Sequence, residues 1–330
     1  METPEVNDDH AILEFTAGVP DNLMARQIAT DAQTIAQEVE RVVVTDPKTV
    51  QLSILGLLAE GHILLEDVPG VGKTLLGKTL SAAIECDFKR IQFTPDLLPT
   101  DITGTTVFDM KSSTFNFVAG PIFSNVMLAD EINRTGPRTQ AALLEAMAEQ
   151  QVSIEGDVKK LPSPFLVIAT QNTSESHGTF PLPDSQKDRF MVSMGMGLPS
   201  PEQEVEILQR SQHGMPSAEP VITAERVVEM REMVKRIEVD SKIRQYIVKL
   251  AGHTRNNSSV RHGLSPRGGA ALQRAAQAWA AMGGRSYVEP QDVSEIAEYV
   301  IAHRLMMQPA ASITANEAVM EAIDEIQVPG

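Results

Sequence analysis

The chain has a single cysteine, and this scarcity excludes two classes of site. Its 330 residues include only Cys86, so neither an intramolecular disulfide nor a multi-cysteine metal site can form. Cys86 lies among small apolar residues at 82–86. A free cysteine in such a stretch usually packs like a small apolar residue, so we expect no redox or nucleophilic chemistry from it.

Long hydrophobic runs are also missing. A membrane-spanning helix needs about 20 consecutive apolar residues, whereas the apolar run at 52–59 ends at Glu60-Gly61-His62. Residues 1–21 are acidic and lack the basic start and apolar centre of a secretory signal. We therefore expect a cytoplasmic protein without a membrane span, in which residues 1–21 form a flexible acidic arm.

Basic residues are few relative to acidic ones. The chain carries 44 Asp and Glu against 28 Lys and Arg, which gives a net charge of −16 at pH 7. A field of this sign repels phosphate backbones and anionic membranes. No dense run of Lys and Arg with interleaved aromatics appears. Nucleic acid is therefore disfavoured as a partner.

The hydrophobic pattern divides the chain into two parts. Apolar strands at 62–65, 90–93, 125–129 and 165–169 alternate with helical patterns, and two hairpins are expected at 105–118 and 151–160. Beyond a Pro-rich break near 197–201, only helical periodicities are found, at 201–212, 222–236, 240–253, 266–282, 290–306 and 315–326. The sequence predicts an α/β core over 22–198, with a parallel sheet covered on both faces, and a smaller helical domain over 199–330.

One loop joins an apolar strand to a helix and has the composition of a triphosphate site. Strand 62–65 leads into Pro69-Gly70-Val71-Gly72, and a helix begins at Lys73. The N–H groups of such a loop can wrap phosphate oxygens, and the positive end of the helix adds to their field. In this pattern the lysine reaches the terminal phosphates, and the hydroxyl of Thr74 ligates Mg²⁺.

The loop departs from the strict phosphate-loop pattern at one position. Asp67 stands where that pattern has its first glycine, five positions before Gly72. The carboxylate can point away from the phosphates, because this is the first position of the loop. On this motif alone, a hairpin or a helix-capping loop with a chance Gly-Lys-Thr remains an alternative.

Polar residues follow two further buried strands. Asp130 and Glu131 end the strand at 125–129, and Asn172 follows the strand at 165–169. Ligands of open α/β sheets bind at the carboxyl ends of the strands. Asp130 can therefore hold Mg²⁺, and Glu131 can polarise a water for attack on the γ-phosphoryl group. Asn172 can contact that water or the phosphate, although a turn-forming asparagine is an equal alternative.

Two arginines are candidates for charge stabilisation. Arg189 follows a long loop and is either a surface charge or a finger that reaches a neighbouring subunit's γ-phosphate. Arg267 lies in the first turn of the helix at 266–282, where a positive charge opposes the helix dipole. This unfavourable place invites a functional interpretation, with a surface arginine as the alternative.

Together these segments resemble the MoxR family of AAA+ ATPases over about residues 39–305. The resemblance rests on the motifs at 61–74, 120–123, 130–134, 141–147, 169–172, 178–183, 188–190 and 263–267. It implies a P-loop core with a parallel five-stranded sheet, β-hairpin insertions on the substrate side and an all-α lid domain.

The resemblance also implies the roles of single residues. The nucleotide-binding segment would comprise Pro69, Gly70, Val71, Gly72, Lys73, Thr74 and Leu75. The catalytic set would comprise Glu131, Lys73, sensor 1 at Asn172, the arginine finger at Arg189 and sensor 2 at Arg267, with Thr74 and Asp130 on the metal. The implied cofactors are ATP and Mg²⁺.

A finger that acts in trans implies a homo-oligomeric ring, usually hexameric. Family members are chaperone-like and often act with von Willebrand factor A domain proteins. We therefore expect a Mg²⁺-dependent ATPase that remodels or activates protein complexes. The alternative is a nucleotide-gated assembly scaffold that binds ATP with little turnover.

Overall fold

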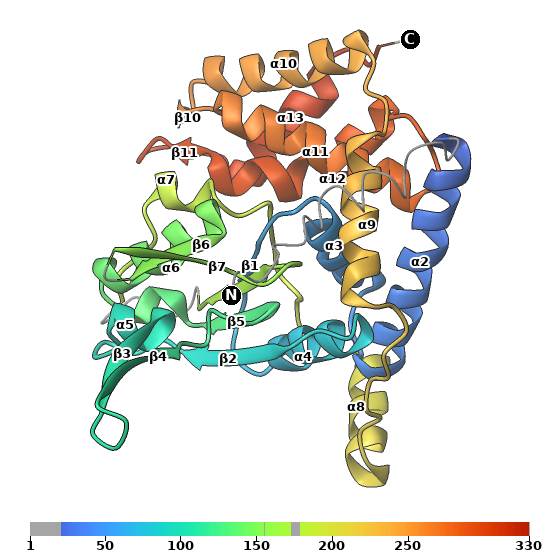
Figure 1. Ribbon diagram of the computed structural model, residues 1–330. Coiled ribbons are helices and arrows are strands. Elements are labelled where there is room, and N and C mark those ends of the chain that lie inside the picture. Colours follow the sequence, from blue (N-terminus) through green and yellow to red (C-terminus); the bar gives the residue numbers. More distant parts are fainter. Residues whose placement is uncertain (1–20, 155, 173–178, 330) are drawn as a thin grey trace.

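The structure is a computed structural model that describes residues 21–154, 156–172 and 179–329 (Figure 1). The expected acidic arm lies outside the described residues except for Asp21, which is the first residue of helix α2 (Asp21–Val42). An α/β part carries the sheet, and a group of helices lies above it in the view of Figure 1.

The predicted parallel sheet is confirmed and has five strands in the order β2-β5-β8-β1-β9. The strands are β1 (Ile63–Glu66), β2 (Phe88–Gln92), β5 (Val126–Asp130), β8 (Leu166–Gln171) and β9 (Val192–Met194). All four pairings within this sheet are parallel. The residue pattern alone indicated four of these strands, because β9 has only three residues and leaves no periodic signal.

Side chains alternate across the sheet, so both faces are buried. Ile63 and Leu65 of β1 belong to one hydrophobic cluster and Leu64 to the other. The first cluster includes residues of α2, α3 (Pro47–Leu58) and α4 (Lys73–Ala83), and the second includes residues of α6 (Pro137–Glu149). The sheet is therefore covered by helices on both faces, as the continuous apolar strands predicted.

Local capping explains where α3 begins. Pro47 occupies its first turn, and the side chain of Asp46 accepts a hydrogen bond from the backbone N–H of Lys48. Cys86 follows α4 and packs against the first cluster, and burial raises the pKa of its thiol to about 12. This agrees with a packing role for the cysteine.

Both predicted hairpins are present as separate two-stranded sheets. One consists of β3 (Gly104–Asp109) and β4 (Thr114–Ala119) and follows the short helix α5 (Pro99–Thr103); the other consists of β6 (Gln151–Ile154) and β7 (Asp157–Lys160). The β3–β4 hairpin projects from the body of the molecule (Figure 1). The two hairpins touch where the ammonium of Lys159 lies 4.7 Å from the ring centre of Phe117.

The predicted C-terminal helices are α8 (Pro201–His213), α9 (Ala224–Lys235), α10 (Ser241–Asn256), α11 (Pro266–Met282), α12 (Pro290–Ile301) and α13 (Ala315–Glu325). A short 3-10 helix, η2 (Ala302–Arg304), follows α12. This part also contains two short antiparallel strands, β10 (Val260–His262) and β11 (Met306–Met307), which the sequence pattern did not indicate.

The helical part packs against the core. Helix α2 contacts α9 and α11, and the first hydrophobic cluster continues from the sheet into α9–α12. Helix α8 extends away from this body (Figure 1). Within the described ranges, no helix is long and apolar enough to cross a membrane. The division of the chain at residues 198 and 199 stays a prediction.

Candidate functional site

The loop after β1 forms an open cradle at the start of α4. Gly70 and Gly72 have φ of 90° and 98°, a left-handed conformation that L side chains rarely adopt. A Cβ added to Gly70 would meet no atom within 4 Å. Backbone N–H groups at the start of an α-helix are unsatisfied and favour an anion. The loop thus offers the donors and the space that phosphate groups need.

Asp67, the departure from the strict pattern, points away from this cradle. Its carboxylate accepts hydrogen bonds from the backbone N–H groups of Met196 and Gly197, the latter at 3.1 Å. Its backbone carbonyl accepts a hydrogen bond from Nζ of Lys73 at 3.1 Å. The acidic side chain therefore fastens the loop to the segment after β9 and leaves the cradle free.

A pocket of about 450 Å³ lies where the loop faces the carboxyl ends of β5 and β8. Its lining consists of Pro69, Gly70, Gly72, Lys73, Thr74, Leu75, Arg90, Gln92, Asp130, Glu131 and Asn172. The structure thus brings together the phosphate-loop, acidic and amide candidates that the sequence placed at the ends of three strands. Arg90 and Gln92 of β2 were not predicted.

Asp130 is held by two neighbouring strands. Its Oδ1 accepts a hydrogen bond from the Thr170 hydroxyl at 2.7 Å, and its Oδ2 accepts one from Nη2 of Arg90 at 2.6 Å. The same hydroxyl of Thr170 accepts the backbone N–H of Glu131 at 2.8 Å. Thr170 is fully buried, so it fixes the position of both acidic residues. Sequence reasoning missed it because a threonine inside a strand is ordinary.

The carboxylate of Glu131 is paired with two side chains, those of Gln92 and Arg134. Its Oε2 accepts a hydrogen bond from Nε2 of Gln92 at 2.5 Å and lies 3.1 Å from Nε of Arg134. The φ of Glu131 is 56°, a conformation that is uncommon for residues other than glycine and is concentrated at functional sites. Asn172 lines the same pocket and is 4% exposed.

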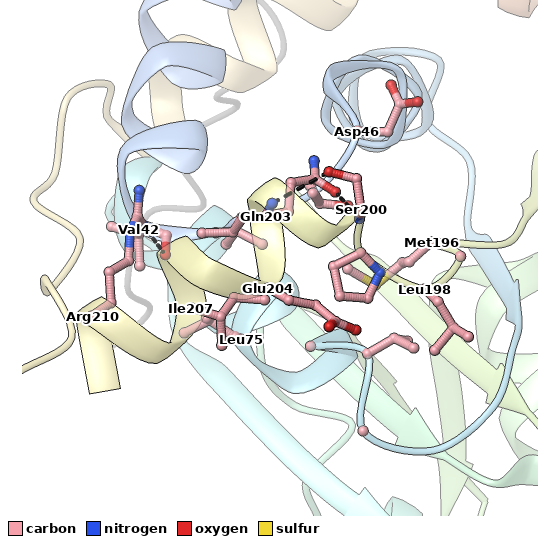
Figure 2. Close-up of a pocket in the computed structure, with 18 of the residues that line it drawn as sticks. Val42, Asp46, Leu75, Met196, Leu198, Ser200, Gln203, Glu204, Ile207 and Arg210 are labelled. Carbon is pink, nitrogen blue, oxygen red and sulfur yellow. Dashed lines mark hydrogen bonds between the residues drawn. The ribbon is translucent and has the colours of Figure 1, made fainter. Parts of the chain in front are cut away.

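A second, more apolar pocket of about 970 Å³ also borders the loop. Its walls come from residues 42–47, the phosphate loop, residues 196–200 and α8. Figure 2 shows Gln203, Ile207 and Arg210 along α8 where the helix borders the pocket. Arg210 donates to the carbonyls of Arg41 and Val42 at 2.9 Å each, so it joins α8 to the end of α2. The size and apolar lining suit a planar base.

Arg189 and Arg267 lie apart from these pockets, since neither is among the described residues that line them. Arg189 follows helix α7 (Asp184–Lys187), is half-buried, and donates from Nη1 to the carbonyl of Leu144 at 2.9 Å. Arg267 is exposed in the first turn of α11. The structure therefore does not bring either arginine to the phosphate side of its own subunit.

Comparison with known proteins agrees with this architecture. Residues 62–192 match the ATPase family associated with various cellular activities (AAA), and residues 252–323 match the AAA lid domain. The crystal structure of a proposed ATPase from Cytophaga hutchinsonii superposes with a TM-score of 0.88 at 34% identity, covering 96% of this chain and 100% of that one.

Two relatives extend over most of the chain. YeaC of Bacillus subtilis, an uncharacterized protein, is 45% identical over 89% of this chain and 93% of its own length. The protein named Chaperone MoxR1 of Mycobacterium tuberculosis is 40% identical over 86% of this chain and 78% of its own length. With the AAA and lid matches, this similarity shows that the chain is an ATPase that belongs to the MoxR family of AAA+ proteins.

Proposed function

We propose that the protein hydrolyses ATP in a Mg²⁺-dependent reaction and uses the energy to remodel or activate a protein complex. The observation that carries the proposal is the phosphate cradle of Gly70 and Gly72, which faces Asp130 and Glu131 across one pocket. The adjoining apolar pocket supplies a place for the adenine base. Phosphate, metal and base would thus each have a matching environment in two pockets that share lining residues of the loop.

The donor set fits a magnesium nucleotide. Lys73 would reach the terminal phosphates, while the Thr74 hydroxyl and the Asp130 carboxylate are oxygen ligands of the kind that Mg²⁺ prefers. When bound, Mg²⁺ would supply charge neutralisation between the β- and γ-phosphates. Thr170 holds Oδ1 of Asp130, and Oδ2 would exchange its contact with Arg90 for the metal. The loop amides from Pro69 to Leu75 would hold the remaining phosphate oxygens.

Glu131 would act as the general base on the attacking water. Its carboxylate must first leave the amide of Gln92 and the guanidinium of Arg134 that hold it in this state. Asn172, which lines the same pocket, would orient that water or the γ-phosphate. The two assignments place a base and a hydrogen-bonding amide on the same side of the nucleotide.

Arg189 would complete the site of a neighbouring subunit. This role is supported by its place outside both pockets of its own subunit, and it requires a homo-oligomeric ring, which we propose to be a hexamer. Arg267 would approach the γ-phosphate when the helical domain moves as a lid. An arginine finger contributes about 10³–10⁵ in rate to phosphoryl transfer.

The client is proposed to be a protein complex. The relative named Chaperone MoxR1 is 40% identical to this chain, and the β3–β4 hairpin exposes Phe108, Met110 and Phe115, which are side chains able to contact a polypeptide. A von Willebrand factor A domain protein is the partner class that we propose to test first, by capture on Glu131→Gln protein loaded with ATP.

Steady-state phosphate release tests the proposed chemistry. We expect Mg²⁺-dependent turnover in the wild type and a loss of about 10²-fold or more in Glu131→Gln, because removal of a general base costs about 10²–10⁴. The exposed Glu149 at the end of α6 offers the matched control Glu149→Gln, which should keep full activity. Equal, appreciable turnover in Glu131→Gln would refute the role of Glu131. ATP binding without turnover in the wild type would favour the assembly scaffold.

A further inference from the structure

Arg304 of the helical domain forms hydrogen bonds with the chain on both sides of Arg189. Its Nε donates to Oδ1 of Asp188 at 2.9 Å, its Nη2 to the carbonyl of Phe190 at 2.6 Å, and its Nη1 to the carbonyl of Met191 at 3.2 Å. The guanidinium therefore binds the residue before Arg189 and the two residues after it. A planar fork of donors is suited to fixing several acceptors in one geometry.

The segment from Asp188 to Met191 is also held by contacts with the α/β core. The Phe190 side chain is fully buried among apolar residues that include Leu143 and Leu144 of α6. The Phe190 carbonyl accepts a second hydrogen bond from Nε2 of His303, at 3.0 Å. The backbone that carries Arg189 is thus held between a helix of the core and η2 of the helical domain.

The ion pair between Arg304 and Asp188 is largely buried. The Arg304 side chain is 3% exposed and that of Asp188 is 19% exposed. Burial lowers the pKa of Arg304 to about 10, while the opposing charge of Asp188 raises it, so the guanidinium stays charged at neutral pH. A buried charge without partners is strongly unfavourable. We therefore expect Arg304 and the Asp188–Met191 segment to move together whenever the helical domain moves.

The aliphatic part of the Arg304 side chain, next to the guanidinium, lies against the start of α11. A Cβ added to Gly268, the residue after Arg267, would come within 3.1 Å of Cδ of Arg304. The positive charge of Arg267 lowers the pKa of Arg304. The Arg304 side chain thus lies between the helix start that carries Arg267 and the segment that carries Arg189.

We propose that Arg304 is a positioning residue that couples the placement of the helical domain to the orientation of Arg189. A shift of α11 and η2, as would accompany nucleotide binding under the lid, would move the guanidinium and with it the segment on either side of Arg189. The nucleotide state of one subunit would thereby set whether its arginine is presented to the next. The inference rests on the proposed trans role of Arg189.

Subunit mixing tests the coupling. Arg304→Gln should lower kcat by about 10²-fold, the cost of a misplaced catalytic group, and leave the affinity for a fluorescent ATP analogue unchanged. Glu131→Gln subunits keep the nucleotide-binding residues and an undisturbed Arg189 but lack the proposed general base, so mixing them with Arg304→Gln subunits should restore turnover. Mixing Arg304→Gln with Arg189→Ala should restore nothing, because neither variant presents the arginine.

Arg231 of α9 provides a matched control. It is 4% exposed, its Nε donates to the carbonyl of Leu57 at 2.8 Å, and burial lowers its pKa to about 10. Arg231→Gln should lower the melting temperature as Arg304→Gln does, but without a selective loss of kcat. If Arg304→Gln does not fold, Arg304→Lys retains the buried charge but not the fork. Arg304→Lys should lose part of the wild-type kcat, and subunit mixing should restore it as for Arg304→Gln.

The outcomes separate this inference from the proposed function. Failure of Glu131→Gln subunits to restore Arg304→Gln, when they do restore Arg189→Ala, would overturn the inference alone. Full turnover in Arg304→Gln or Arg304→Lys beside an inactive Arg189→Ala would do the same. Wild-type turnover in Arg189→Ala would overturn the proposed role of Arg189, and the coupling with it.

Discussion

Acidification should weaken the fold through one histidine. His62 directly precedes β1 and is 4% exposed. Its Nδ1 accepts the backbone N–H of Val167 at 3.0 Å, and its Nε2 donates to the carbonyl of Met147 at 3.1 Å. Burial lowers its pKa to about 4; the Met147 carbonyl opposes the shift, and the charge of Arg231 adds to it. A proton on Nδ1 would face the N–H of Val167 and break that contact.

The direction and size of the effect follow from the two pKa values of His62. In the unfolded chain it titrates near 6.5 and in the folded protein near 4. Above pH 6.5 it is neutral in both states, so its contribution to stability is complete. As the pH falls toward 4, only the unfolded chain takes up the proton, and the free energy of unfolding decreases. The loss is about 2 kcal/mol between pH 7.5 and 5.0 and about 3 kcal/mol well below pH 4.

Urea unfolding of the wild type and of His62→Gln at both pH values isolates this contribution. Glutamine offers one acceptor and one donor but does not titrate, so the variant should lose about 2 kcal/mol less than the wild type between pH 7.5 and 5.0. The difference cancels the other titrating groups, including buried His303, whose pKa is also lowered by burial. Equal losses in the two proteins, or a pKa of His62 near 6.5 by NMR, would refute the reasoning.

Two further substitutions test the site. Asp67→Ala should weaken binding of a fluorescent ATP analogue about tenfold, because the N–H groups of Met196 and Gly197 lose a charged acceptor worth about 1.5–3 kcal/mol. Asp67→Asn keeps an acceptor oxygen and should bind the analogue nearly as the wild type does. Wild-type affinity in Asp67→Ala would contradict the proposed role of Asp67 in holding the loop. Thr170→Val should reduce kcat with little change in nucleotide affinity, because Asp130 loses its orienting hydroxyl. Steady-state kinetics would check it, and a rise in KM alone would contradict it.

The parts of the site that the sequence predicted share a local cause. Lys73 follows the loop after the short apolar strand β1, and Asp130 is the last residue of the apolar strand β5, so residues nearby in the chain fix their environment. Parallel strands then bring their carboxyl ends to one edge without further information. The same reasoning holds for the sheet itself, whose central strands are continuous apolar runs. Local pattern was sufficient wherever the contacts were short-range.

The residues that the sequence did not indicate owe their roles to distant neighbours. Arg90 and Gln92 contact the acidic residues Asp130 and Glu131 only because β2 pairs with β5. The apolar pocket combines residues 42–47 with residues 196–215, which ordinary hydrophobic patterns cannot connect. Arg304 lies at the end of a helix, where basic residues are common for electrostatic reasons. Nothing in its local sequence distinguishes it from a surface arginine.

A distant partner explains why an aspartate, Asp67, stands where the phosphate-loop pattern has a glycine. Its carboxylate receives the N–H of Met196, a residue 129 positions away that lines the apolar pocket. Its carbonyl receives the ammonium of Lys73, which lines the phosphate pocket. A glycine at this position would leave the first contact unmade. The aspartate therefore joins the proposed base pocket to the phosphate loop, so a displacement of Met196 by a bound base would be transmitted to the backbone that holds Lys73.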